Sequence, residues 1–207
     1  MSMFDTALEG NEAVAFADLT LHSLRTHLSR GAWFDVCRPW ALNAWPVFTE
    51  LHESIAWQAE RRTMYERVVE VPRLMSFVGP HQRPPHPFLD SVRNELNRHY
   101  RSELGEDFES IGMCLYRDGR DSVAWHGDTI GRGATSDTMV AVLSLGASRH
   151  FVLRPRGGGN AIRVAIGHGD LLVMGGSCQR TWEHAVPKTS KAVGPRISIQ
   201  YRPRGVR

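Results

Sequence analysis

The stretch Trp125-His126-Gly127-Asp128 is the most informative part of this chain, because it places two metal-binding side chains two residues apart. In a β-strand, residues i and i+2 point to the same face, so His126 and Asp128 can approach one metal ion while Gly127 faces away. Two imidazoles and one carboxylate can hold Fe(II) on one face of its octahedron and leave the other positions open. We therefore predict a non-haem Fe(II) site in which His184 arrives from another strand. The alternative is a surface histidine beside a capping aspartate, since the pattern often arises by chance.

The stretch Arg196-Ile-Ser-Ile-Gln-Tyr-Arg202 strengthens the metal interpretation. Polar and apolar residues alternate along it, which predicts a strand with Arg196, Ser198, Gln200 and Arg202 on one side. Arginines inside a barrel need an anion, because a buried unpaired charge is very costly. A dicarboxylate that also chelates iron would supply this anion. The alternative is a pair of solvated arginines on an edge strand.

The composition is typical of one globular domain. The chain has 207 residues, of which 42% are hydrophobic, and this is enough for one sizeable core. No apolar run approaches the length of a transmembrane helix and no export signal is evident, so we expect no membrane association. Cys37, Cys114 and Cys178 are too few and too scattered for a disulfide framework, which favours a reducing cytoplasm. We expect a monomer.

The basic residues are biased towards arginine. The formal net charge is +3, and Lys188 and Lys191 are the only two lysines. Arginine binds phosphate groups better than lysine does because its planar guanidinium forms two hydrogen bonds at once. The bias favours a nucleic-acid partner, although a GC-rich genome would also replace lysine by arginine.

Helical patterns are confined to the N-terminal part of the chain. Three helices are expected from apolar spacing: one within residues 1–30 around Leu21, Leu24 and Leu28, one over 46–56, and one over 87–104. The tryptophans of this part are expected in the core: Trp33, Trp40, Trp45 and Trp57.

From Ser110 onward the pattern changes to short strands separated by glycine-rich turns. Eight strands are expected: 111–117, 122–127, 139–145, 149–154, 162–166, 170–174, 181–186 and 196–202. Eight short strands suggest two packed sheets. The expected fold is therefore mainly β with a helical N-terminal part, in which residues 1–109 pack on a double-stranded β-helix (jelly-roll) core of residues 110–207 within one structural domain.

The same motifs resemble the AlkB group of Fe(II)/2-oxoglutarate dioxygenases, in the branch that contains the eukaryotic nucleic-acid repair homologues. The resemblance covers about the C-terminal half in several ordered motifs and is looser at Pro72-Arg-Leu74. These motifs are Leu115-Tyr-Arg-Asp-Gly-Arg-Asp-Ser-Val-Ala-Trp-His-Gly-Asp128, Ser144-Leu-Gly-Ala-Ser-Arg-His-Phe151, His168-Gly-Asp-Leu-Leu-Val-Met174, Trp182-Glu-His-Ala-Val-Pro187 and Pro195 through Arg202.

The resemblance implies a role for each matching residue. His126, Asp128 and His184 would be the iron ligands. Arg196 would bind the distal carboxylate of 2-oxoglutarate with help from the Tyr116 hydroxyl, and Arg202 would lie near the chelating end. The family uses Fe(II), 2-oxoglutarate and O2 to oxidise N-alkyl groups on nucleobases of DNA or RNA, releasing formaldehyde and succinate.

The chain departs from the family pattern at several positions. Cys114 stands where the family usually has an asparagine that points at 2-oxoglutarate, and Ser198 and Gln200 replace its usual asparagine and threonine. We keep these three residues as candidates for co-substrate binding. Thr129 and Ile130 follow Asp128, where repair members usually carry acidic residues that help to read the base. The base preference and the substrate class are therefore open.

The region of about residues 56–80 corresponds to the nucleotide-recognition lid of the resembling family. Its arginines could hold phosphates while an aromatic side chain stacks on a base. The alternative is that its aromatic and methionine side chains pack into the core. The candidate substrate-binding residues are Arg61, Arg62, Tyr65, Arg67, Arg73 and Phe77.

Three hypotheses follow. The first is a dioxygenase that demethylates alkylated bases in DNA or RNA. The second keeps the chemistry and changes the substrate to a protein, a lipid or a small molecule. The third is a non-enzymatic binding module, which the presence of all three ligands and both arginines disfavours.

Overall fold

The computed structural model describes residues 13–64 and 67–206, and only the backbone within 61–64 and 67–70. The fold is mainly β. The helices are α1 (Leu19–His22), α2 (Trp45–Ser54), α3 (Pro87–Leu104) and α4 (Cys178–Thr181), with short 3-10 turns η1 (Ser29–Gly31) and η2 (Arg132–Ala134). The strands are β1 (Ala15–Phe16), β2 (Leu24–His27), β3 (Ala32–Cys37), β4 (Ala41–Leu42), β5 (Gln58–Met64), β6 (Arg67–Val78), β7 (Phe108–Tyr116), β8 (Val123–His126), β9 (Val140–Gly146), β10 (Arg149–Pro155), β11 (Ile162–Ile166), β12 (Leu171–Gly176), β13 (Trp182–Val186) and β14 (Arg196–Pro203).

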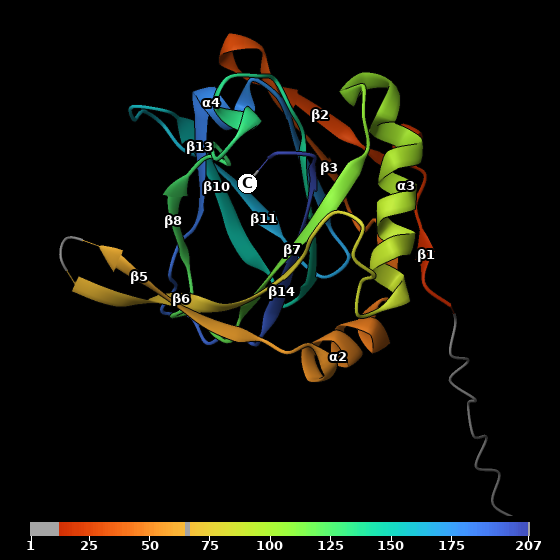
Figure 1. Ribbon diagram of the computed structural model, residues 1–207, viewed down its shortest axis with the longest axis vertical. Helices are drawn as coiled ribbons and strands as arrows, with labels where there is room; N and C mark the ends of the chain where they lie inside the picture. Colours follow the sequence, from red (N-terminus) through yellow and green to blue (C-terminus); the bar gives the residue numbers. More distant parts are fainter. Residues whose placement is uncertain (1–12, 65–66, 207) are drawn as a thin grey trace, which may run out of the picture.

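Two antiparallel sheets contain most of the strands (Figure 1). The larger sheet has the order β2-β3-β12-β9-β14-β7-β6-β5, and the smaller one has the order β11-β10-β13-β8. Strands β1 and β4 form a separate pair. All eight strands expected beyond Ser110 are present with ends close to the expected ones, because short apolar or alternating runs bounded by turn residues mark them in the sequence.

The central strands of the larger sheet are buried on both faces. Val142 of β9 belongs to one buried cluster with Leu153 of the smaller sheet, so the two sheets pack through their inner faces. Leu143, the next residue, belongs to a second cluster with Leu96 of α3. A strand covered on both sides has no solvent-facing positions, and this is why β9 reads as a continuous apolar run.

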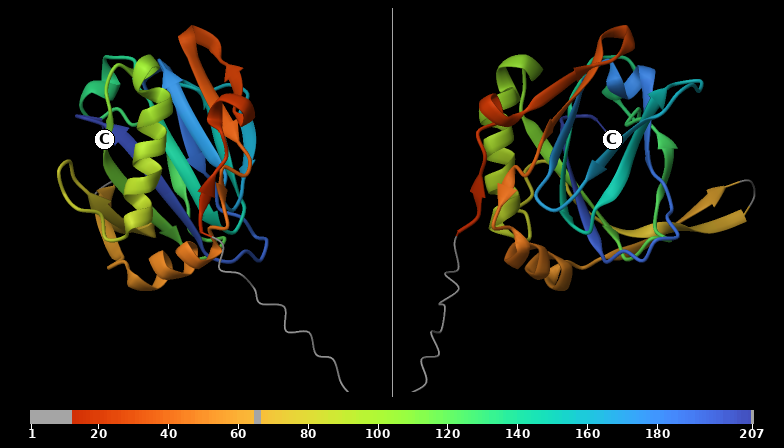
Figure 2. Two further views of the ribbon diagram at one scale, coloured as in Figure 1. Left: turned by 90° about the vertical axis from the view of Figure 1, so that its right-hand side faces the viewer. Right: turned by 180° about the vertical axis from the view of Figure 1, so that it is seen from behind.

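Helix α3 covers the outer face of the larger sheet (Figure 2). Its start is capped by His86, whose Nδ1 accepts a hydrogen bond of 3.1 Å from the backbone N–H of Phe88. Its end is set by Gly105, which has a φ of +79° that glycine adopts readily. The expected helix over 87–104 is therefore confirmed. Within the described parts of the chain, no helix is both long and apolar enough to cross a membrane.

Two expectations for the N-terminal part are wrong. No long helix joins Leu21, Leu24 and Leu28, because α1 has four residues and Leu24 then pairs with Val36 in the larger sheet. Pairing of two consecutive strands, β2 and β3, has overridden the local helical spacing. Trp45 is not in the core either: it is 57% exposed, at the start of α2.

Strands β5 and β6 form a hairpin that extends from the end of the larger sheet, away from α3 (Figure 1, Figure 2). The inner part of β6 pairs with β7, whose residues Cys114 and Gly112 lie opposite Met75 and Phe77. The region expected to form a lid is thus a hairpin that is continuous with the sheet. Its base adjoins the strand that carries Tyr116.

Candidate metal and co-substrate site

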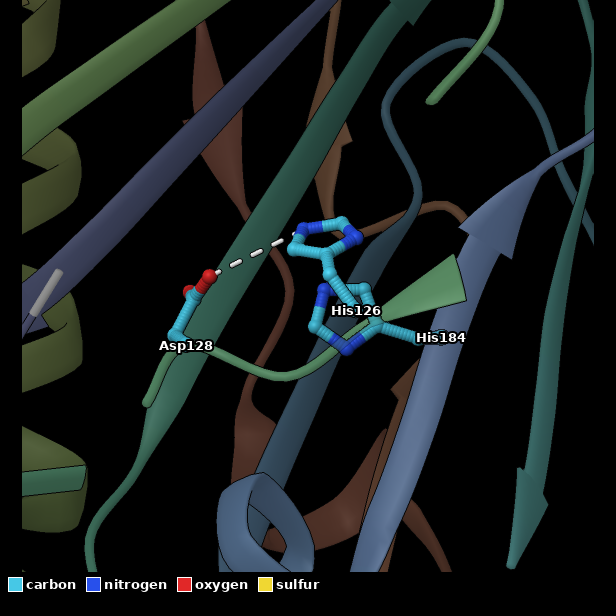
Figure 3. A group of neighbouring side chains, drawn as sticks. All are labelled: His126, Asp128 and His184. Carbon is cyan, nitrogen blue, oxygen red and sulfur yellow. Dashed lines mark ion pairs between the residues drawn. The ribbon is translucent and has the colours of Figure 1, made fainter. Parts of the chain in front are cut away.

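The three expected metal ligands come together between the two sheets (Figure 3). His126 and His184 are directly opposite each other on the paired strands β8 and β13. With Asp128, they bring one ligand atom each within 4.8 Å of the others. The Nδ1 of His126 lies 2.8 Å from the carbonyl oxygen of Ala124, to which it must donate, because a carbonyl can only accept. The Nε2 lone pair is therefore free for a metal ion.

The loop after β8 is fixed by α4. The backbone N–H of Asp128 donates a 2.9 Å hydrogen bond to the Oε1 of Gln179. A Cβ at position 127 would lie 2.2 Å from the carbonyl oxygen of Gln179, so only glycine fits there. Because residue 127 has no side chain, the backbone can pack closely against Gln179, and Asp128 then points inward beside His126.

Asp128 is a buried carboxylate with one strong partner. Its Oδ2 accepts a 2.8 Å hydrogen bond from the Nε of Arg202, while its Oδ1 lies 3.8 Å from the Nε2 of His126. Burial alone would raise the pKa of the Asp128 carboxyl, but the charge of Arg202, together with those of His184 and His126 when these are protonated at low pH, lowers it to about 2. The carboxylate is therefore ionised at neutral pH, with one oxygen directed towards the two imidazoles.

His184 is held as a neutral imidazole. Burial, followed by the charge of His126, lowers the pKa of His184 to about 3. The ring stacks on Phe151 with centroids 5.2 Å apart and an interplanar angle of 17°. A metal ligand must be unprotonated, so burial prepares His184 for binding.

Arg196 forms a buried anion-binding group. Its side chain is fully buried, and its Nε donates a 2.8 Å hydrogen bond to the Oγ of Ser144. Among the described residues, its Nη1 and Nη2 have no hydrogen-bond partner. Burial lowers the pKa of Arg196 and raises that of Tyr116, its partner in the β7–β14 register, to about 12. A carboxylate placed here would meet two free N–H groups and a protonated phenol, so these residues fit the distal end of 2-oxoglutarate.

A second buried arginine, Arg149, lies near the same tyrosine. The guanidinium of Arg149 is 5.7 Å from the centroid of the Tyr116 ring. It donates to the carbonyl oxygens of Asp118, Asp121 and Pro187 at 3.0, 2.9 and 2.7 Å. Arg149 therefore joins the β7–β8 loop to the segment after β13 and adds positive charge near Arg196.

Three other candidate co-substrate residues bond mainly to one another. The Nε2 of Gln200 donates to the Oγ of Ser198 at 2.6 Å, and the Sγ of Cys114 lies 3.9 Å from the Oε1 of Gln200. These side chains lie on the same face of the sheet as Arg196, but they add no unpaired hydrogen-bond donor to those of its guanidinium. We infer a supporting position for them rather than a direct one.

The candidate substrate residues are divided between two places. Phe77 is 53% exposed and lies opposite Gly112, where a Cβ would come within 2.7 Å of Arg202 Nη1. Its side chain is therefore on the same face of the sheet as Arg202, which binds Asp128. Arg73 donates from Nη1 to the carbonyl oxygen of Ser122 at 3.2 Å, while its buried Nε has no hydrogen-bond partner among the described residues.

Three of the remaining substrate candidates lie in the outer part of the hairpin. Arg61, Arg62 and Arg67 are on β5 and β6, where the structure gives the backbone alone. Tyr65 lies outside the described residues. Their proposed contacts with phosphates or a base stay predictions.

The sequence did not single out three residues that the structure places at the site. Ser144 and Arg149 lie in a stretch that matches the resembling family, which was the available signal. Gln179 lies in the single turn α4 between β12 and β13, where no periodic pattern marks it. Its contact with Asp128 arises from tertiary packing alone.

Comparisons with known proteins agree with this geometry. A sequence profile described as the 2OG-Fe(II) oxygenase superfamily matches residues 43–202. The Homo sapiens protein named alpha-ketoglutarate-dependent dioxygenase alkB homolog 3 is 32% identical over 171 residues, covering 76% of this chain and 56% of that protein. The Arabidopsis thaliana protein named DNA oxidative demethylase ALKBH2 is 28% identical over 195 residues, covering 77% of this chain and 62% of that protein.

A solved structure, that of OsALKBH1, shares the fold with a TM-score of 0.59 at 16% sequence identity. The alignment covers 87% of this chain and 100% of that chain. The chain spans 56% and 62% of the lengths of the human and Arabidopsis thaliana relatives, so each relative contains further sequence.

Proposed function

Because the chain belongs to the 2OG-Fe(II) oxygenase superfamily, we propose that it is an Fe(II)- and 2-oxoglutarate-dependent dioxygenase that demethylates N-alkylated bases in DNA or RNA. One observation carries the proposal: the two unpaired, buried Nη groups of Arg196 lie in the same inter-sheet space as a metal-binding triad. A buried cation with free donors needs an anion, and a dicarboxylate that chelates iron meets this need. We also propose that the two sheets form a double-stranded β-helix.

In this proposal, each side chain has one task. His126, Asp128 and His184 hold Fe(II), and Arg202 orients the Asp128 carboxylate so that one oxygen faces the metal. Arg196 and Tyr116 hold the distal carboxylate of 2-oxoglutarate. Bound Fe(II) would supply the activation of O2 with 2-oxoglutarate as reductant, which leaves as succinate and carbon dioxide. One oxygen atom of O2 would enter succinate and the other would hydroxylate the N-methyl group, which would then leave as formaldehyde and return an N–H to the base.

The nucleic-acid substrate is supported by the names of the relatives and by the hairpin. One relative is named a DNA oxidative demethylase. The exposed Phe77 is suited to stack on a base that has left its helix. We propose that residues 56–80 act as a lid, that residues 1–109 pack as an extension on the 110–207 catalytic core, and that the protein works as a monomer. The free, buried cysteines are compatible with a reducing cytoplasm.

A second candidate keeps the chemistry and changes the substrate to a protein, a lipid or a small molecule. It is favoured by Thr129 and Ile130, which give the segment after Asp128 no acidic side chain to read a base. Ile130 is 70% exposed and offers an apolar contact there instead.

One experiment separates the two candidates. Formaldehyde release is measured with Fe(II) and 2-oxoglutarate on a panel of methylated single- and double-stranded DNA and RNA oligonucleotides. The proposal expects release from at least one of them, and none with Asp128→Ala. Succinate formation without formaldehyde release from any oligonucleotide would favour the second candidate.

A further inference from the structure

The strand that carries His126 is held by few backbone contacts. Strand β8 lies at the edge of the smaller sheet, so it has one neighbour, β13. The pairing of these strands contains two register partners, His184–His126 and Val186–Val123, with an irregularity between them. Such a short, irregular edge pairing specifies the register of β8 only weakly. The same pairing sets the distance between the imidazoles of His126 and His184.

A group of side chains on the outer face of the smaller sheet reinforces this pairing. Arg154 of β10 donates from Nε and Nη2 to the Oε2 of Glu183 at 3.2 and 3.1 Å. Its guanidinium carbon also lies 4.1 Å from the centroid of the Trp125 ring. Arg154 thus contacts Glu183 on β13 and reaches across this strand to Trp125 on β8. We call Arg154, Glu183 and Trp125 the outer clamp.

The members of the outer clamp are sequence neighbours of the metal ligands. Trp125 directly precedes His126, and Glu183 directly precedes His184. Successive residues of a strand point to opposite faces, so the clamp lies behind the imidazoles and away from the inter-sheet space. The clamp therefore has no direct access to the metal or to a substrate, and it acts on them only through the backbone of β8 and β13.

We propose that Arg154 is a positioning residue that, through Trp125 and Glu183, fixes the spacing of His126 and His184 for metal binding. The inference rests on the proposed function, because it concerns the same metal site. The Arg154 and Glu183 side chains are 31% and 18% exposed, so the ion pair is partly shielded from water. The stacking on Trp125 adds a cation–π contact that requires a cation at position 154.

The test measures metal affinity directly, with Mn(II) titrated into the full-length, metal-free chain by calorimetry. Replacement of groups that orient metal ligands commonly weakens metal affinity by about 10- to 100-fold, and we expect about tenfold for Arg154→Met. Trp125→Leu should weaken binding similarly, while Trp125→Phe, which keeps a ring, should retain most of the affinity. Arg163→Met is the matched control, because Arg163 is an exposed arginine on the same outer face.

Two further measurements separate positioning from general stability. The melting temperature of each metal-free variant shows the structural cost, and the rise in melting temperature on adding Mn(II) should be smaller in Arg154→Met than in Arg163→Met. Glu183 keeps a cation nearby in Arg154→Met, since Arg156 Nη1 is 4.0 Å from its Oε1, so the variant leaves no isolated charge. If Arg154→Met does not fold, Glu183→Gln removes the ion pair at nearly constant shape and carries the same expectation.

If folded Arg154→Met or Glu183→Gln bound Mn(II) as tightly as the wild type, this inference would be overturned and the proposed function would remain intact. A wild-type chain that binds no Mn(II) would overturn the proposed metal site itself, and the inference with it. In the Arg154→Met Glu183→Gln double variant, a loss no larger than that of the worse single variant would support one shared contact.

Discussion

Gly112 has no side chain, and this absence leaves the space that the guanidinium of Arg202 occupies. A Cβ at this position would be 2.7 Å from Arg202 Nη1 and 3.1 Å from Gln200 Oε1. The guanidinium of Arg202 therefore occupies space that exists because residue 112 has no side chain. Since Arg202 Nε binds the Asp128 carboxylate, the size of residue 112 is coupled to the orientation of a proposed metal ligand.

We expect Gly112→Ala to weaken metal binding without unfolding the chain. The added methyl group meets the flexible end of Arg202 rather than backbone, so the arginine moves and loses its hydrogen bond with Asp128. The loss of an orienting partner should weaken Mn(II) affinity by about tenfold. Gly194→Ala is the control, because a Cβ there has no neighbour within 4 Å. An unchanged Mn(II) affinity in Gly112→Ala would show that Arg202 does not orient Asp128.

Arg196 should determine the affinity for the co-substrate. Arg196→Lys keeps a positive charge but loses the two parallel donors that fit a carboxylate. Such charge-assisted bonds are worth about 1.5–3 kcal/mol, so the KM for 2-oxoglutarate should rise at least about tenfold. Arg163→Lys, at an exposed position, is the matched control. If steady-state kinetics gave the same KM in Arg196→Ala as in the wild type, the anion pocket would lie elsewhere.

At the scale of elements, β7, β8, β13 and β14 determine the site, and their positions could be expected from sequence. Alternating residues mark the two faces of a strand, so Arg196, Ser198, Gln200 and Arg202 were placed on one side, as the structure has them. The pairing of β2 with β3 was not expected, because the apolar spacing of Leu21, Leu24 and Leu28 favoured a helix, whereas the chain turns at η1 and forms a hairpin. The contact of Gln179 with Asp128 was also beyond sequence, since it depends on how α4 packs.

The β5–β6 hairpin gives a prediction for its inner end. If Phe77 stacks on the flipped base, Phe77→Ala should weaken productive binding of a methylated oligonucleotide by about 1–3 kcal/mol. The KM for 2-oxoglutarate should not change, because Phe77 lies opposite Gly112 on β7, whereas Arg196 lies opposite Tyr116 at the end of that strand. Leu24→Ala, an exposed apolar residue on β2, provides the comparison. Oligonucleotide kinetics indistinguishable from wild type in Phe77→Ala would remove the stacking role.

At the scale of the whole molecule, the site places a buried neutral imidazole and a buried arginine with free donors in one inter-sheet space. Such groups favour ligand binding and oppose folding of the ligand-free chain, because each would be better solvated in the unfolded state. The burial of these polar groups should therefore lower the free energy of unfolding of the metal-free chain. Metal and 2-oxoglutarate should both stabilise it, since they bind only the folded chain.

The stability of the metal-free chain should fall as the pH is lowered from 7 to 5. Burial lowers the pKa of His184 to about 3 in the folded chain, whereas an unfolded histidine titrates near pH 6.5. Between these values the unfolded chain binds the additional proton, so at pH 5 His184 should cost about 2 kcal/mol of unfolding free energy. Asp128, with a folded pKa of about 2, loses its stabilising effect only below about pH 3.9.

Denaturant unfolding in the presence of a chelator measures this dependence. His184→Gln should reduce the decline between pH 7 and 5, and His150→Gln, at an exposed position, should leave it unchanged. If wild type and His184→Gln lost stability equally over this range, the imidazole of His184 would not be buried in its neutral form.

The central claim is that one inter-sheet space holds Fe(II) at His126, Asp128 and His184 and a dicarboxylate at Arg196. Anaerobic calorimetric titration of 2-oxoglutarate, with and without Fe(II), tests both halves together. We expect Fe(II) to tighten 2-oxoglutarate binding at least about tenfold, because the ligand bridges the metal and the arginine, and a coupling of about 1.4 kcal/mol corresponds to this factor. In Asp128→Ala the effect of Fe(II) should disappear, while the weaker metal-independent binding at Arg196 remains. Equal affinity for 2-oxoglutarate with and without Fe(II) in the wild-type chain would contradict the claim.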